Sequence, residues 1–138
     1  MKLFFPVQRA TLLIPTPVDG RKDLKHLFIL LTDPVTHEKL VLIVSLSSVK
    51  KGIPYDNSCV LYPGDHSFIS KKSFVDYSRI QIVPADKIVN GVKKGVFQPF
   101  ETLHTDLFAR VCHGLQISER TKPRFLNFYL DWLQAKGS

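Results

Sequence analysis

Residues 26–45 read HLFILLTDPVTHEKLVLIVS, in which two apolar runs flank the polar segment DPVTHE. Each run has the length of a β-strand, and the Asp and Pro residues between them are typical of a turn. Because the apolar residues are nearly continuous, we expect both faces of each strand to be covered, as in a packed or closed sheet. The stretch therefore predicts two central strands that pair in antiparallel orientation across the turn.

Three more segments before residue 98 have the composition of strands. They are TLLIP (11–15), SCVLY (58–62) and SFVDYSRIQIV (73–83). The last one contains two interleaved sets of side chains, namely Phe74, Asp76, Ser78 and Ile80, and Val75, Tyr77, Arg79 and Gln81. The connecting segments are dense in Pro, Gly, Asp or Asn, and residues 84–97 predict a single short helical turn.

After residue 98 the apolar residues recur at helical spacing. The first helix is predicted by Leu103, Leu107, Phe108, Val111 and Leu115. Gly114 is expected to end it, and Thr121 is expected to cap a second helix with Pro123 in its first turn. That helix carries a broad apolar stripe made of Phe125, Phe128, Tyr129, Trp132 and Leu133. Such a stripe is typical of a core-packing face, and an oligomer or partner surface is the alternative.

Together these patterns predict an α+β domain, with five or six mostly antiparallel strands and two C-terminal helices that cover the barrel or sheet. The 138 residues are 44% hydrophobic and 22% charged, which is typical of a globular chain. No repeat, low-complexity tract or long linker separates two domains. We therefore expect a single domain over 1–138, with a β-barrel over 1–98 and a helical extension over 99–138.

No apolar run approaches the roughly 18–20 residues that span a bilayer. The N-terminal MKLFFPVQRA is interrupted too early for a signal peptide, so we expect a cytoplasmic protein with no membrane partner. Cys59 and Cys112 stand far apart and lack metal-ligand spacing, so we expect reduced, partly buried thiols. No metal or other cofactor is predicted.

The net charge is +7, from 19 Lys and Arg against 12 Asp and Glu. This balance favours an acidic partner, such as nucleic acid, a phosphorylated ligand or an acidic protein segment. The cationic residues form doublets that fall in predicted loops. One doublet alone is typical of a solvated loop, whereas several on one face would form a surface for a phosphate backbone. The candidate nucleic-acid-binding residues are Lys50, Lys51, Lys71 and Lys72.

Common phosphate-loop, dinucleotide-binding, zinc-protease and nucleophile-elbow motifs are absent, which argues against nucleotide hydrolysis and dinucleotide binding. What remains is a set of polar residues at strand ends. Lys25 and His26 open one central strand, and Ser45, Ser47 and Ser48 close the other. Antiparallel pairing of these strands is expected to bring the two groups together.

A cluster of Lys, His and Ser without paired carboxylates suits cleavage of RNA without a metal. One group must take the 2′-OH proton, another must protonate the leaving 5′-oxygen, and cations must stabilise the transition state. Histidine is the natural proton carrier near neutral pH. A structural role is the alternative for each residue, since His26 can flank a strand and Ser47-Ser48 can cap a loop.

The stretch LYPGDHSFISKKS (61–73) poses the same choice for Asp65 and His66. Pro63-Gly64 is typical of the centre of a type II turn, which by itself explains a polar tip between two strands. We therefore expect Asp65 and His66 to be turn residues, with His66 kept as a candidate for a supporting catalytic role.

The order of strands and polar residues over about 5–90 resembles the MazF/PemK-like toxins of toxin–antitoxin systems. The segments that carry the resemblance are KHLFILLT, LVLIVSLSS and CVLYPGDHSFISKKSFVDYSRIQIVPADKI. It implies an SH3-like barrel that cleaves RNA without metal, is held by an antitoxin and commonly forms a dimer. It also places Lys25 at the family's catalytic arginine, Ser47 at its catalytic threonine and Ser48 at the neighbouring serine.

The chain departs from this pattern, because lysine lacks the bidentate fork of arginine and because His26 and Ser45 replace prolines. Two functions are therefore carried forward. One is a toxin-like, metal-independent endoribonuclease that acts on single-stranded RNA, with catalytic candidates Lys25, His26, Ser47, Ser48 and His66. The alternative is a non-catalytic SH3-like module that binds a protein or nucleic acid, for which an exposed part of the 125–133 stripe would be the signature.

Overall fold

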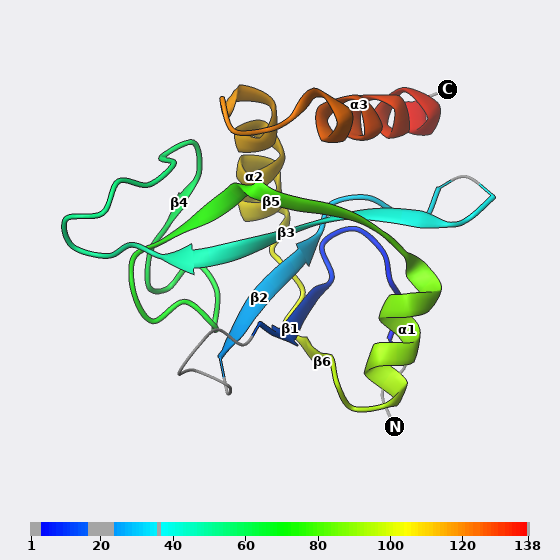
Figure 1. Ribbon diagram of the computed structural model, residues 1–138, viewed down its shortest axis with the longest axis horizontal. Helices are drawn as coiled ribbons and strands as arrows, with labels where there is room; N and C mark the ends of the chain where they lie inside the picture. The colour runs from blue at the N-terminus through cyan, green and yellow to red at the C-terminus, as the bar shows by residue number, and fades with distance from the viewer. Residues whose placement is uncertain (1–3, 17–23, 36, 138) are drawn as a thin grey trace.

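The computed structural model describes residues 4–16, 24–35 and 37–137, and its centre is an antiparallel sheet curled into a half-barrel (Figure 1). The strands of the described chain are β1 (Thr11–Pro15), β2 (Lys25–Leu30), β3 (Leu40–Ser48), β4 (Val60–Leu61), β5 (Ser73–Pro84) and β6 (Gln98–Phe100). They lie in the order β4-β5-β3-β2-β1-β6. The predicted α+β class, with a mostly antiparallel sheet and C-terminal helices, is confirmed.

Strands β2 and β3 form the predicted antiparallel pair at the centre of the sheet. Phe28 of β2 lies opposite Ser45 of β3. Residues 27–32 and 41–46 are buried without interruption. Both faces of the sheet are thus covered here, which is why these two strands lack the polar alternation of a solvent-facing strand.

One face of the sheet carries the larger hydrophobic cluster and is covered by α2 (Thr105–Ile117) and α3 (Pro123–Gly137) (Figure 1). Tyr129 and Trp132 of α3 are buried in this cluster, and the other aromatic rings of the stripe pack against it. Full burial of such a side chain contributes roughly 1.5–3 kcal/mol. The stripe is therefore a core-packing face, as predicted from its spacing.

The opposite face carries a smaller cluster beneath α1 (Ala85–Lys93). Ile88 of α1 packs there with side chains from the first three strands, namely Leu12, Phe28, Leu30, Val41 and Ile43. Alternate residues of a strand share a face, so His26 on β2 and Ser45 on β3 continue this surface beyond the apolar cluster. We call this side of the sheet the α1 face. The candidate site lies where the residues along the α1 face change from apolar to polar.

Two boundaries differ from the sequence-based expectation. Residues 85–93 form a nine-residue helix rather than a single turn, because Ala85 and Ile88 bury against the sheet. Residues 98–100 form β6, which pairs with β1, so the sheet extends past residue 98 and the helical part begins at Thr105.

The expectation that Gly114 ends the first C-terminal helix is wrong, since α2 continues to Ile117. Gly114 is needed inside the helix because the Tyr77 hydroxyl occupies the place of a Cβ atom there. That hydroxyl donates a hydrogen bond to the carbonyl oxygen of Val111 at 2.7 Å. Thr121 does not cap α3 either, since its hydroxyl donates to the carbonyl oxygen of Leu115 at 2.8 Å.

No helix in the described part of the chain combines the length and the apolar composition needed to cross a bilayer.

Candidate functional site

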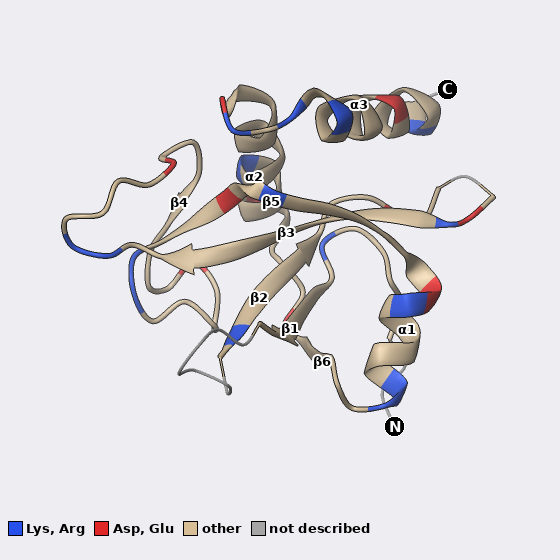
Figure 2. Ribbon diagram, viewed as in Figure 1, with Lys and Arg blue, Asp and Glu red and all other residues tan. Residues whose placement is uncertain are grey.

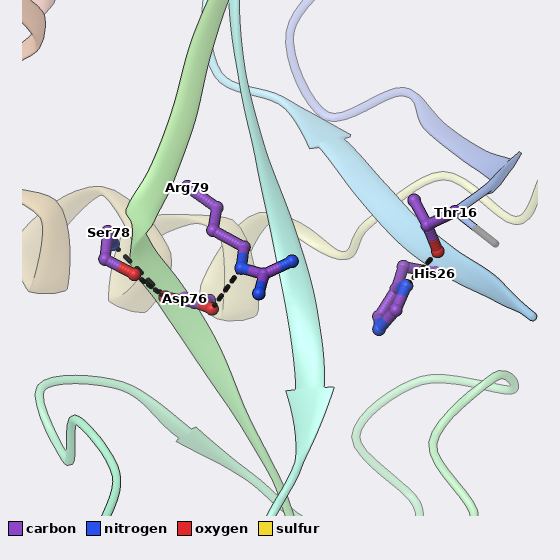
Figure 3. A network of polar contacts seen from close by, with 5 residues as sticks. All are labelled: Thr16, His26, Asp76, Ser78 and Arg79. Atoms are coloured by element: carbon purple, nitrogen blue, oxygen red, sulfur yellow. Dashed lines mark hydrogen bonds and ion pairs between the residues drawn. The ribbon is translucent and has the colours of Figure 1, made fainter. Parts of the chain in front are cut away.

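A polar cluster lies on the α1 face, where the smaller hydrophobic cluster ends (Figure 3). Its members are Thr16, His26, Asp76, Ser78 and Arg79. They come from the residue after β1, from the start of β2 and from the middle of β5. Figure 3 shows the Arg79 side chain extending from β5 across β3 towards His26, with Asp76 beside it.

His26 is half-buried and occupies the second position of β2, on the face that Phe28 and Leu30 share. Its Nδ1 forms a hydrogen bond with the hydroxyl group of Thr16. This bond fixes the orientation of the ring. Among the described residues, none forms a hydrogen bond with Nε2, so this nitrogen is the one available for proton transfer.

The surroundings of His26 favour its neutral form. Burial lowers the pKa of the imidazole below the ordinary value of 6.5, and the positive charge of Arg79 lowers it further. Asp76 raises this pKa, and Lys50 again lowers it. At neutral pH the ring is therefore uncharged, which is the state in which a histidine accepts a proton.

A β-bulge in β5 turns Arg79 towards this face. Across β3 and β5, Ile43 pairs with Gln81 and Ser45 pairs with Asp76, with a register shift between the two pairs. A single residue of β3 thus faces the β5 segment 77–80. The bulge shifts the alternation of the strand, so that Asp76, Arg79 and Gln81 share the α1 face while Ile80 enters the larger cluster.

Asp76 is buried and holds this part of β5 in place. Its Oδ1 accepts hydrogen bonds from the Ser78 backbone N–H at 3.2 Å and from the Ser78 hydroxyl at 2.5 Å. Its Oδ2 lies 3.4 Å from Nε of Arg79. Because the ion pair uses Nε, and the Arg79 side chain is 69% exposed, the terminal nitrogens of the guanidinium remain open to an anion.

The structure separates the strand-end candidates onto two faces. His26, Ser45 and Ser47 lie on the α1 face, as does Asp76, which pairs with Ser45. Lys25 alternates with His26 and is exposed on the other side of the sheet, opposite Pro15 of β1. Ser48 likewise alternates with Ser47 and is exposed.

Two of the lysine doublets lie on neighbouring loops (Figure 2), and the charge of Lys50 acts on His26. The Val49 backbone N–H donates to the carbonyl oxygen of Lys72 at 2.9 Å, so the segments with Lys50-Lys51 and Lys71-Lys72 are neighbours. All four lysines are exposed. Nζ of Lys72 lies 5.6 Å from the centroid of the Tyr55 ring and 5.9 Å from that of Tyr62, a cation–π arrangement.

His66 belongs to a different part of the molecule. It is buried and its Nδ1 accepts a hydrogen bond from the Phe68 backbone N–H at 3.1 Å, so its Nε2 donates to the Glu101 carbonyl oxygen at 2.7 Å. Nε2 therefore holds the loop before β5 to the chain after β6, and Nδ1 fixes the ring within that loop. This geometry accounts for His66 without a catalytic role.

The expected turn is present beside it. The Asp65 backbone N–H donates to the Tyr62 carbonyl oxygen at 2.9 Å, and Gly64 has φ of 101°, as the third position of a type II turn requires. The Asp65 carboxylate accepts from the Tyr62 backbone N–H at 2.8 Å and lies 3.7 Å from Arg110. Asp65 is thus a turn residue in its contacts.

Four members of the site were not predicted from the sequence, namely Thr16, Asp76, Ser78 and Arg79. A uniform alternation through 73–83 places Asp76 and Arg79 on opposite faces, and only the bulge brings them together. The available signal was Asp-Tyr-Ser, in which an Asp side chain can bond the backbone two residues later. The second signal was Arg79 itself, a charged residue in the middle of a predicted strand.

Comparison of the chain with family models, with curated proteins and with solved structures gives no match. The resemblance to MazF/PemK-like toxins therefore remains a prediction that rests on the residues quoted for it.

Proposed function

We propose that this chain is a metal-independent endoribonuclease that acts on single-stranded RNA. The observation that carries the proposal is the arrangement of His26, Asp76 and Arg79 on one face of the sheet, with a neutral imidazole next to an accessible guanidinium. These groups supply the base and the phosphate-binding cation that cleavage by the neighbouring 2′-OH requires.

In the proposed reaction, Nε2 of His26 accepts the proton of the 2′-OH, and the 2′-oxygen forms a bond to phosphorus. The bond from phosphorus to the 5′-oxygen breaks, and this oxygen takes a proton from solvent water, since the site is open at Arg79. The products are a 2′,3′-cyclic phosphate and a 5′-hydroxyl end. Arg79 binds the non-bridging oxygens and stabilises the charge that they gain in the transition state.

Asp76 acts through Arg79. By contacting Nε it directs the guanidinium across β3, and by accepting from Ser78 it keeps the bulge in the shape that aims Arg79 at the α1 face. The Lys50-Lys51 and Lys71-Lys72 segments provide a cationic rim along which the RNA backbone can continue.

The assignment differs in detail from the one that the family resemblance implies. Lys25 lies on the other face from His26, so Arg79 takes the phosphate-binding role in this proposal. Ser47 shares the α1 face and stays a candidate donor to the phosphate. A toxin role, a cognate antitoxin and a homodimer follow from the resemblance alone and belong to the proposal.

The alternative is a non-catalytic binding module, whose signature would be an exposed part of the 125–133 stripe. Tyr129 and Trp132 are buried instead, and Leu133 is 37% exposed. The surface that was to identify such a module is thus largely part of the core, and the catalytic proposal accounts for more of the geometry.

The test is cleavage of single-stranded RNA oligonucleotides by the purified protein in EDTA. Cleavage should yield cyclic-phosphate ends, and His26→Ala and Arg79→Ala should each lower kcat/KM by about 10²–10⁴-fold. His113→Ala and Arg124→Ala, at exposed positions on α2 and α3, are matched controls that should keep full activity. Absence of cleavage by the wild-type protein, or full activity of the His26 variant, would sink the proposal.

The toxin role has its own test. Expression of the wild-type chain should arrest growth, expression of His26→Ala should not, and a neighbouring gene product should relieve the arrest if it is the antitoxin. Analytical ultracentrifugation of the purified chain then determines whether it forms the homodimer. A growth effect that persists in the His26→Ala variant would remove the toxin role from the proposal.

A further inference from the structure

A cavity of about 220 Å³ lies on the α1 face, between α1, β5 and the ends of β1 and β2. Thr16 lines this cavity and also forms the hydrogen bond with Nδ1 of His26. The cavity therefore begins at the residue that orients the proposed base. A group bound in the cavity would therefore be separated from His26 by Thr16 alone.

The walls of the cavity are mostly apolar and include two aromatic rings, Phe28 and Phe97. Phe97 is held in place by Gly91 of α1. Its backbone N–H donates to the Gly91 carbonyl oxygen at 3.0 Å, and its ring lies so close to the Gly91 Cα that a Cβ atom there would collide with it. The aromatic wall is thus preformed by contacts within the protein.

Two polar side chains line the same cavity. Gln81 follows the bulge on β5 and is exposed, and its amide both donates and accepts hydrogen bonds. Lys87 of α1 adds a positive charge. The cavity is smaller than the roughly 300–1,000 Å³ of sites for drug-sized ligands, so it has room for one ring system rather than a whole nucleotide.

We propose that this cavity, the base pocket, binds the nucleobase next to the scissile phosphate and that Gln81 recognises its hydrogen-bonding edge. The inference rests on the proposed ribonuclease function, which supplies the RNA. An apolar slot with aromatic walls and one amide suits a flat, polar-edged ring. Lys87 lines the cavity, and the charges of Arg79 and Lys50 act on the neighbouring His26, so cations are available for the adjoining phosphates.

The first arm of the test measures cleavage of a full set of RNA dinucleotides. At one of the two nucleotide positions, wild type should prefer one base over the others, as judged by kcat/KM. Gln81→Ala should change the ratio of kcat/KM between the best and the worst base at that position by about tenfold. Phe97→Ala should raise KM by about tenfold for every base, because stacking depends little on base identity. Gln98→Ala, at an exposed position on β6 outside the pocket, is the control and should leave both quantities unchanged.

The second arm measures binding without catalysis. Dinucleotides with a 2′-deoxyribose in the first nucleotide have no attacking hydroxyl. Their binding is followed by the NMR shifts of Ile88, which also lines the pocket, in wild type, Phe97→Ala and Gly91→Ala. We expect base-dependent binding to wild type, and binding that is at least tenfold weaker for both variants. The Gly91 variant tests the wall without removing it, since its methyl group must displace the Phe97 ring.

The outcomes separate the two proposals. If wild type cleaves RNA and Gln81→Ala changes cleavage equally for all bases, or not at all, the base pocket is overturned. The ribonuclease proposal is supported in that case. Base-dependent binding that Phe97→Ala abolishes, without any cleavage by wild type, supports the pocket and overturns the ribonuclease. Neither cleavage nor binding overturns both.

Discussion

The hydroxyl group of Tyr77 fills the space beside Gly114 that a Cβ atom would need, so β5 and α2 are in direct contact. Gly114→Ala places a methyl group against this hydroxyl, and Tyr77 cannot withdraw because it is 1% exposed. We expect the free energy of unfolding to fall by about 1–3 kcal/mol, measured by urea denaturation. Gly137→Ala, where the same atom meets open space, is the control.

A double-mutant cycle separates this clash from helix propensity. Tyr77→Phe alone should cost about 0.5–1.5 kcal/mol, through its hydrogen bond to Val111. It also removes the nearest of the atoms that a Cβ at position 114 would meet, so the double variant should lose less stability than the two single variants together. Additive losses would contradict the contact.

The pKa of His26 should lie below 6.5, because burial and the charges of Arg79 and Lys50 oppose its protonation. An NMR titration of the imidazole measures it directly. Arg79→Gln should raise this pKa and Asp76→Asn should lower it, whereas Arg120→Gln on the loop after α2 should have no effect. An unchanged titration in the Arg79 variant would show that the guanidinium does not face the ring.

The lowered pKa of His26 also fixes the sign of two pH dependences. The folded state binds this proton less readily than the unfolded chain, so its contribution to stability is complete above about pH 6.5 and is lost as pH falls through the folded pKa. If His26 is the base, kcat/KM falls over the same acidic range and is level above it. Urea titrations and rate measurements at matched pH values should agree, and a rate that increases towards acid would exclude His26 as the base.

Asp56 should stabilise the fold through the contact between the loop before β4 and the end of α2. Its carboxylate accepts from the Ser58 backbone N–H at 2.9 Å and from the hydroxyls of Ser58 at 2.6 Å and Ser118 at 2.5 Å. Asp56→Ala should cost about 1–3 kcal/mol at pH 7, measured by urea denaturation. Asp131→Ala, an exposed position on α3, is the control.

The cost of Asp56→Ala should depend on pH. Burial acts to raise the pKa of this carboxyl, but the hydrogen bonds from Ser118 and Ser58 and the charge of Arg120 outweigh it, so the pKa is below 3.8. This stabilisation is present above about pH 4 and is lost as the pH falls through the folded pKa. A difference between wild type and variant that stays constant down to pH 2 would contradict the role of the charged form.

His66 should prove to be a structural residue. Because both its ring nitrogens are hydrogen-bonded and its ring lies 5.9 Å from that of Phe100, His66→Ala should lower stability by about 1–3 kcal/mol. Below its own unfolding transition, the variant should keep the specific activity of wild type. A variant of full stability that has lost activity would restore His66 to the catalytic candidates.

Lys72 should contact RNA phosphate and not a specific base. Replacing Lys72 with Ala should weaken binding of single strands of any sequence and reduce the slope of log K against log salt by about 0.7, as expected for one lost phosphate contact. Lys94→Ala, at the end of α1, is the control for loss of one positive charge. Equal effects of the two substitutions would indicate a general effect of net charge.

The sequence predicted the central strands and the C-terminal helices because their signals are local: apolar runs of strand length and a helical apolar stripe. It predicted Pro63-Gly64 as a type II turn for the same reason. The role of Gly114 depends on Tyr77, which is distant in the chain, and no local pattern contains that contact. Arg79 was missed because one bulge changes which side chains share a face, and strict alternation cannot anticipate it.

The boundary between the smaller hydrophobic cluster and the polar end of β2 and β3 has a consequence for how this protein can change. His26, Ser47 and Arg79 lie outside both hydrophobic clusters, so we expect substitutions there to leave the packing beneath α1 and beneath the C-terminal helices intact. The residues that would carry the chemistry can therefore be exchanged separately from those that hold the sheet and the helices together.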